Sequence, residues 1–153
     1  MTTATAPRSV LDELDRPATT RISRLARLLR RELDGQLSAH GLTGVQLGLL
    51  TRLARTDGLV QAELGRRMAI EAATLTGIVQ RLEREGWVRR NCDAGNRRLQ
   101  HVWLTDKARL ALPALLRLQG RYRRRALAGL DASDLALLER LLHRIEGNLS
   151  RWS

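Results

Sequence analysis

Two short helical patterns, the tight turn between them and a polar hairpin after them constrain this chain more than any other feature. Apolar residues recur at three- and four-residue steps in both helical patterns, whereas the hairpin segments are short and rich in β-branched and aromatic residues. The helices are predicted at residues 61–68 and 72–85, and the strands at residues 87–91 and 99–104. This order predicts a mainly α fold with a small β-hairpin wing.

Further helical patterns flank this unit on both sides. Helices are predicted at residues 20–39, 43–55, 105–127 and from 131 onward, after a loose arm at residues 1–19. Thr43 and Gln46 form a capping-box pattern at the start of the second helix. Pro113 lies inside the long fifth pattern, where proline predicts a kink or a break.

The charge balance points to a polyanionic partner. The 153 residues include 27 basic and 16 acidic ones, which gives a formal net charge of +11. Lys107 is the one lysine, and arginine suits phosphate and guanine because its planar guanidinium makes forked hydrogen bonds. A GC-rich genome explains arginine in place of lysine, but it does not explain the surplus over acidic residues.

Several function classes find no support in the sequence. No phosphate-cradling glycine loop, nucleophile–base pair or paired carboxylates indicate an enzyme, and no cofactor is expected. The three histidines are far apart and Cys92 is the one cysteine, so neither a metal site nor an internal disulfide is expected. Cys92 is interpreted as structural or incidental. No apolar run reaches membrane-spanning length, and we expect a cytoplasmic protein without membrane contacts.

The fourth helix is the candidate for DNA reading. With its aliphatic stripe turned inward, an outward face remains that carries no charge between Glu71 and Arg81, whereas solvated faces usually carry several. A helix in the major groove needs small residues for close approach and polar residues for base edges. The outward residues are Ala72, Ala73, Thr74, Thr76, Gly77, Gln80 and Arg81. Thr74, Thr76 and Gln80 are the candidate readers, and either alanine suits a thymine methyl group.

The hairpin and nearby arginines are candidates for contacts with the DNA backbone and the minor groove. A narrow minor groove concentrates negative potential and favours an arginine on a thin finger. The wing candidates are Arg89, Arg90, Asp93, Asn96, Arg97 and Arg98, and the phosphate candidates are Arg66, Arg67 and Arg84. A solvated charged loop, or simple solvation of each arginine, is the alternative interpretation.

In order and spacing, residues 42–106 resemble the MarR family of winged-helix transcription regulators. The matching segments are Leu42–Gln46, Leu59–Leu64, Thr74–Thr76, Arg81–Val88, Asp93–Arg98 and Leu104–Thr105. The resemblance implies a winged helix-turn-helix DNA-binding domain at 42–104 and a helical dimerisation domain at 20–41 and 105–153. It also implies Arg97 as the inserted wing residue, held by Asp93. Asn96 and Gly77 depart from the family pattern, which has an aspartate and commonly an arginine at these positions.

The family further implies a homodimer on a palindromic operator in double-stranded DNA, most often as a repressor. The expected interface residues are Leu115, Leu116, Leu118, Leu135, Leu138, Leu142, Ile145 and Leu149. A small aromatic or phenolic anion between the dimerisation helices and the winged domain would act as effector and release DNA; its pocket residues are not specified by the sequence.

Two further interpretations stay open at this point. The chain is alternatively a winged-helix protein-interaction module without specific DNA readout, because the polar groups of the fourth helix are sparse. The densest charge run, Arg121 to Arg125, lies outside the reading unit. It is interpreted as a solvated face or as a source of intersubunit salt bridges, not as a DNA site.

Overall fold

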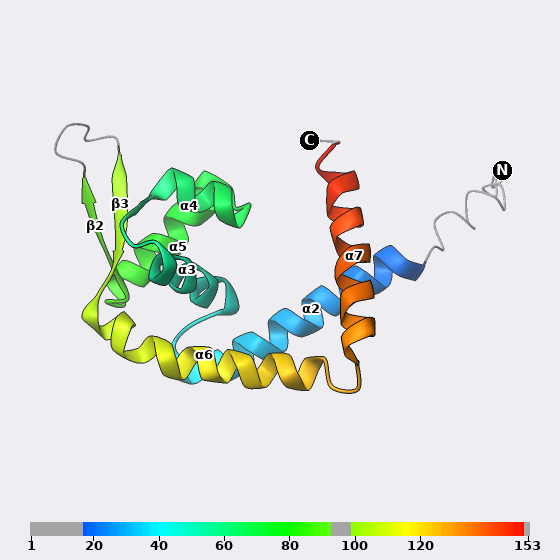
Figure 1. Cartoon of the computed structure of the whole chain (residues 1–153). Helices are drawn as coiled ribbons and strands as arrows, with labels where there is room; N and C mark the ends of the chain where they lie inside the picture. The colour runs from blue at the N-terminus through cyan, green and yellow to red at the C-terminus, as the bar shows by residue number, and fades with distance from the viewer. Residues whose placement is uncertain (1–16, 93–98, 152–153) are drawn as a thin grey trace, which may run out of the picture. The chain divides into compact units, whose positions relative to one another are not determined.

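The computed structural model describes residues 17–92 and 99–151, and its elements follow the order expected for a winged helix-turn-helix (Figure 1). It is mostly helical with one small sheet. The elements are α2 (Pro17–Leu37), the 3-10 turn η1 (Ser38–His40), α3 (Gly44–Arg55), β1 (Leu59–Val60), α4 (Gln61–Met68), α5 (Ala72–Arg84), β2 (Val88–Cys92), β3 (Gln100–Leu104), α6 (Asp106–Ala126) and α7 (Ala132–Leu149).

The sheet has one strand more than the predicted hairpin. Its order is β1-β3-β2 with antiparallel pairs throughout, and Leu59 pairs with Val102 while Val88 pairs with Leu104. The third strand, β1, is only two residues long, too short to show any alternation of polar and apolar residues. Because β1 leads directly into α4 and pairs with β3, it connects the start of the helix pair to the hairpin.

A leucine-rich core fixes the winged unit. Leu50, Leu53 and Leu64 are fully buried, and so are Val79 and Leu82 on the inner side of α5. Close packing of α4 on α5 depends on Gly65, where an added Cβ would lie 3.2 Å from the carbonyl oxygen of Ile70. Apolar contacts therefore hold α5 on one side, and its opposite side is exposed to solvent.

The turn between α4 and α5 is tight because Ala69 adopts a left-handed conformation. Its φ is 51°, and its N–H donates to carbonyl oxygens at the end of α4. Ile70 then donates to the oxygen of Gly65 over 3.0 Å. A non-glycine residue with positive φ is uncommon, and here it sets the angle between the two helices.

The start of α3 is fixed to the end of α2. Thr43 and Gln46 form the predicted capping box, and Gln46 is 4% exposed. In addition, the carboxylate of Asp34 in α2 accepts a 2.6 Å hydrogen bond from the N–H of Gly44. A carboxylate at a helix N-terminus is favourable because unpaired N–H groups point outward there.

Of the kink or break predicted at Pro113, the break does not occur, because α6 continues through this residue from Asp106 to Ala126. The prediction that Leu115 is a dimer-interface residue is also not met. Leu115 is 1% exposed and packs in the core of its own chain, which leaves it no surface for a partner. Backbone contacts divide the chain into residues 1–119 and 120–153, so the boundary falls within this helix.

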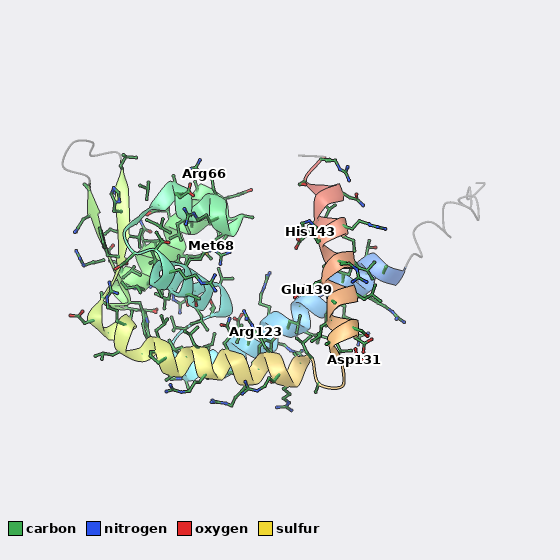
Figure 2. All side chains as sticks on the ribbon, viewed as in Figure 1. Arg66, Met68, Arg123, Asp131, Glu139 and His143 are labelled. Atoms are coloured by element: carbon green, nitrogen blue, oxygen red, sulfur yellow. The ribbon has the colours of Figure 1, made fainter. Side chains whose placement is uncertain are left out.

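The last helix, α7, begins at the predicted cap. Asp131, labelled in Figure 2, accepts hydrogen bonds from the N–H groups of Ser133 and Asp134. These bonds, the one from Asp134 first, hold the pKa of the Asp131 carboxyl below its ordinary value. Within the described ranges, no helix is long and apolar enough to cross a membrane.

Candidate nucleic-acid interface

The outer side of α5 is exposed and uncharged over most of its length. As the sequence predicts, five residues of this side are exposed: Ala72, Ala73, Thr74, Gly77 and Gln80. Leu75 and Val79, which lie between them in the sequence, face the core. An added Cβ at Gly77 would meet nothing within 4 Å. This face therefore combines small side chains with two free polar ones, the composition that a major-groove helix requires.

Thr76 differs from the other predicted readers. Its hydroxyl donates to the carbonyl oxygen of Ala72 over 2.8 Å and accepts from Nε2 of Gln61 over 3.0 Å. The side chain is half-buried, and its hydrogen-bonding groups are already engaged. Thr76 thus links α5 to α4, and Gln61 is a positioning residue that sequence reasoning missed.

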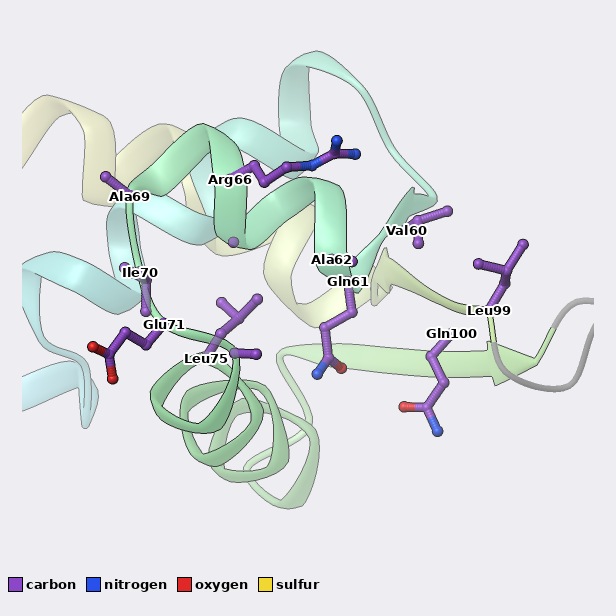
Figure 3. Close-up of a pocket in the computed structure, with 12 residues that line it drawn as sticks. Val60, Gln61, Ala62, Arg66, Ala69, Ile70, Glu71, Leu75, Leu99 and Gln100 are labelled. Atoms are coloured by element: carbon purple, nitrogen blue, oxygen red, sulfur yellow. The ribbon is translucent and has the colours of Figure 1, made fainter. Parts of the chain in front are cut away.

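A hollow of about 600 Å³ lies between α4, α5 and the sheet (Figure 3). In the close-up, Leu75 points from α5 toward α4, and Gln61 and Gln100 reach the hollow from α4 and β3. Most of its lining is apolar, including Ile70 and Leu99. The hollow reaches Leu99 and Gln100 at the start of β3, whereas β2 contacts α5 directly through Arg90 and Glu83.

An ion pair joins α5 to the wing strand β2. Nε and Nη2 of Arg90 in β2 donate to one carboxylate oxygen of Glu83 in α5 over 2.8 and 2.5 Å, and the backbone N–H of Arg90 donates to the other oxygen over 3.2 Å. Nη1 of Arg90 also reaches Gln100 on β3 over 3.3 Å. We call these three residues the wing clamp.

The wing clamp changes the interpretation of Arg90. Its guanidinium is half-buried and its donors are engaged, whereas the neighbouring Arg89 is exposed and lies over the ring of Trp103 at 5.5 Å. The hydrogen bond from Arg90 and its positive charge hold the pKa of Glu83 below its ordinary value of 4.5. Glu83 was not singled out by the sequence, because charged residues in a helix usually face solvent.

The phosphate candidates lie near both ends of the helix pair. Arg66 and Arg67 both pair with Glu63, over 2.5 and 2.7 Å, and the side chain of Arg66 is still 77% exposed. Arg84 is exposed at the end of α5. Arg81 pairs with Glu85 over 2.9 Å and keeps 54% of its side chain exposed. The arginines therefore surround the uncharged face without entering it.

The wing-tip predictions for Asp93, Asn96, Arg97 and Arg98 lie outside the described residues. The wing strands on either side of them are described, and they pair in register from Val88–Leu104 to Cys92–Gln100. These residues remain predictions. Among the described residues, no group of three or more histidine, cysteine, aspartate or glutamate side chains is arranged to hold a metal ion.

A second hollow, of about 550 Å³, lies on the other side of α5, between α2 and the start of α3. Arg30 and Asp34 line it from α2, and Thr74, Gly77 and Arg81 line it from α5. One side of this hollow is thus formed by α5. Any molecule bound there touches residues at the edge of the uncharged face.

Comparisons with known proteins agree with this geometry. The family model described as "MarR family" matches residues 42–99, which include α3, the helix pair and strands β1 and β2. A crystal structure of a probable transcriptional regulator from Pseudomonas aeruginosa is 32% identical, with a TM-score of 0.70, over 81% of this chain and 96% of that one. The chain belongs to the MarR family.

Other similar proteins cover most of the chain. The uncharacterized HTH-type transcriptional regulator YybA of Bacillus subtilis (strain 168) is 26% identical over 85% of this chain and 87% of its own length. A crystal structure of an E. coli MarR mutant with operator DNA has the same fold, with a TM-score of 0.79 at 24% identity, over 85% of this chain and 94% of that one. As a MarR-family member, the chain is a DNA-binding transcription regulator.

The open space at Gly77 gives a stability prediction. Gly77→Ala removes a flexible residue from a helix interior without a clash, so we expect about 0.5–1 kcal/mol of added stability in thermal or urea unfolding. The added methyl group also lies on the reading face, so operator binding should weaken. Gly147→Ala in α7 is the matched control, because its Cβ also meets nothing within 4 Å. Equal DNA binding by both variants would remove Gly77 from the interface.

Proposed function

We propose that this MarR-family protein is a dimeric, sequence-specific repressor that inserts α5 into the major groove of a palindromic operator. The observation that carries the proposal is the uncharged outer face of α5, bordered by Arg66, Arg81 and Arg84. Thr74 and Gln80 are the base readers, and the surrounding arginines contact phosphates, which set the register without carrying sequence information. Because its ligand is DNA, we also propose that the protein acts in the cytoplasm.

The apolar face of α7 supports dimerisation with a second copy. Among the described residues, no side chain of α7 is buried, although leucine and isoleucine recur along one side of the helix. Leu138, Leu142, Ile145 and Leu149 are 37%, 39%, 37% and 56% exposed. A contiguous apolar face of this kind marks an interaction surface in a soluble protein. Leu135 extends this face of α7. Leu116 of α6, 38% exposed, is a separate proposed interface residue, whereas Leu118 packs partly on the core.

The same proposal assigns DNA binding to one domain and dimerisation to the other. Residues 42–104 read DNA, and residues 20–41 together with 105–153 hold two copies together. A two-fold dimer then places its reading helices about 34 Å apart, one turn of the double helix, which is why a palindromic operator is expected.

Arg97 is proposed to enter the minor groove from the wing. Arg97→Ala should weaken operator binding by about tenfold or more and leave the dimer intact, because one narrow-groove contact is lost. Binding is measured by fluorescence anisotropy and the oligomeric state by analytical ultracentrifugation. Arg55→Ala, in the last turn of α3, is a control with the same change of charge. If the Arg97 variant bound as tightly as the parent, the assignment of the wing arginine would be wrong.

A small aromatic or phenolic anion is proposed to release the operator from the hollow between α2, α3 and α5. Arg30 and Arg81 provide guanidinium groups for its carboxylate or phenolate, and Ile70 and Ile78 provide apolar contacts for its ring. The ligand releases DNA only if it prefers the geometry of the free protein. Contact with Thr74, one of the proposed base readers, and with Arg81, which borders the uncharged face, would supply that preference.

The effector proposal predicts stabilisation by 2-hydroxybenzoate. At about one hundred times its dissociation constant, a ligand specific for the folded state adds about 2.7 kcal/mol, which raises Tm in a thermal scan. Arg30→Ala should lose this rise, whereas Arg24→Ala, elsewhere on α2, should keep it. A rise of equal size in both variants, or none in the parent, would contradict binding in this hollow.

A further inference from the structure

The positive charge of this chain is concentrated on α6, not on the reading unit. Residues 42–104 contain ten basic and six acidic residues, a net charge of +4, whereas α6 contains seven basic residues and one acidic residue, a net charge of +6. The acidic residue, Asp106, begins the helix, and the next acidic residue is Asp131. Reading the operator with α5 and the wing does not account for this charge.

Three of the six arginines of α6 share one face of the helix, and its buried positions lie on another face. Ala108, Leu112 and Leu115 are the buried positions of the helix. The buried positions are four and three residues apart, and the same spacing separates Arg117, Arg121 and Arg124. Arg117 follows Leu115 by two residues, which is a rotation of about 200° round the helix axis. The three arginines form one row, which we call the α6 arginine row.

The α6 arginine row is exposed and unpaired. Within residues 17–92 and 99–151, none of its three arginines takes part in an ion pair or hydrogen bond, and the same holds for Arg123, labelled in Figure 2, and Arg125. Like charges three and four residues apart repel one another and destabilise a helix. A bound polyanion would relieve that repulsion.

The composition of this face favours a phosphate backbone over other polyanions. A protein–protein interface is built around apolar or aromatic anchors and is depleted of charge at its centre. Between the row's arginines the face offers Gly120, which has no side chain. A helix that lies on a membrane needs a continuous apolar side to insert. Ala108, Leu112 and Leu115 are buried, and the exposed Leu110 and Leu116 lie on different sides of α6. Guanidinium groups at helical spacing suit successive phosphates, which require charge and forked hydrogen bonds only.

We propose that the α6 arginine row is a second DNA-binding surface, which binds the phosphate backbone of double-stranded DNA independently of sequence. It would hold duplex outside the half-sites, either flanking DNA or a second segment. This inference takes its ligand from the proposed function, but it assigns binding to a helix that the proposed function uses for dimerisation.

The test compares two double variants of the full chain. Arg117→Gln with Arg121→Gln removes two charges from the row, and Arg140→Gln with Arg144→Gln removes two charges at the same four-residue spacing from α7, where both arginines are exposed. The probe is a random-sequence duplex of about 40 base pairs, whose binding is followed by anisotropy as salt is varied. Circular dichroism and analytical ultracentrifugation check folding and the oligomeric state of each variant.

The proposal predicts a change of salt dependence in one variant only. Each phosphate contact contributes about 0.9 to the slope of log K against log salt, so the α6 variant should be less steep by about 1.8 and the α7 variant should match the parent. Equal slopes in both variants, with the parent binding DNA, would overturn the inference and leave the proposed function intact. No DNA binding by the parent at any salt concentration would overturn both.

Two other outcomes would assign the row to a different partner and overturn the inference. A weaker dimer with an unchanged DNA slope would mean that the row pairs with acidic residues of a second copy. Loss of binding to phosphatidylglycerol vesicles with an unchanged DNA slope would mean a membrane surface.

Discussion

Leu142→Glu should convert the protein into a monomer that binds its operator about 10²- to 10⁴-fold more weakly, because the second half-site then no longer benefits from the effective concentration set by the first. Leu142 lies in the middle of the apolar face of α7 and is 39% exposed in the single chain. A carboxylate there would have to be desolvated when the two faces meet, which opposes association.

Leu110→Glu is the matched control for this variant. Leu110 is 83% exposed on α6, so the same substitution costs little in folding and touches no part of the proposed interface. Sedimentation equilibrium should give a dimer for the parent and the control and a monomer for Leu142→Glu. A Leu142→Glu protein that is still dimeric and binds operator with parental affinity would exclude the α7 interface.

Glu83→Gln should weaken operator binding by about 10- to 100-fold, although it removes a negative charge from a protein that binds a polyanion. Electrostatics alone predicts tighter binding. The wing clamp predicts the opposite, because a neutral amide accepts the hydrogen bonds of Arg90 less strongly than a carboxylate, and the spacing between α5 and the wing is then less well defined. Glu139→Gln, on the exposed surface of α7, makes the same charge change and should leave affinity unchanged.

The salt dependence of DNA binding by Glu83→Gln distinguishes a positioning role of Arg90 from a direct contact between Arg90 and a phosphate. If Arg90 contacted a phosphate, releasing it from Glu83 would make the slope of log K against log salt steeper, by about 0.9. If Arg90 only positions the wing, the slope stays unchanged while the affinity falls. Tighter binding by Glu83→Gln would contradict the wing clamp altogether.

The same variant has a predicted pH signature in stability. The pKa of Glu83 is lowered in the folded state by the hydrogen bond from Arg90, so its contribution to stability is fully present above pH 4.5 and is lost as the pH falls through the lowered pKa. The stability difference between parent and Glu83→Gln should therefore be largest near neutral pH and shrink in acid. Urea unfolding at several pH values measures it.

Much of the fold was predictable because its signals are local. Thr43 and Gln46 mark a helix start through a pattern four residues long, and Asp131 does the same for the last helix. The helices of the winged unit bury one side each, so their periodicity is strong. The strand β1 was missed because two residues carry no periodicity, and its pairing with β3 joins residues more than forty positions apart.

The site was only partly predictable because its contacts are not local. The outward face of α5 follows from helical geometry, but Thr76 is engaged by Gln61, fifteen residues earlier, on another helix. Arg90 meets Glu83 only because β2 turns back along α5. Both pairs consist of residues that would be solvated in an isolated element. Their roles depend on the tertiary packing, which the sequence pattern of a single element does not contain.

Selection of random-sequence duplexes by the purified dimer tests the central claim most directly. The account predicts one enriched palindrome with half-sites about one helical turn apart, and a changed preference at one position of each half-site in the Gln80→Ala variant. Recovery of duplexes without a common sequence, or a Gln80→Ala profile identical to that of the parent, would contradict base reading by α5.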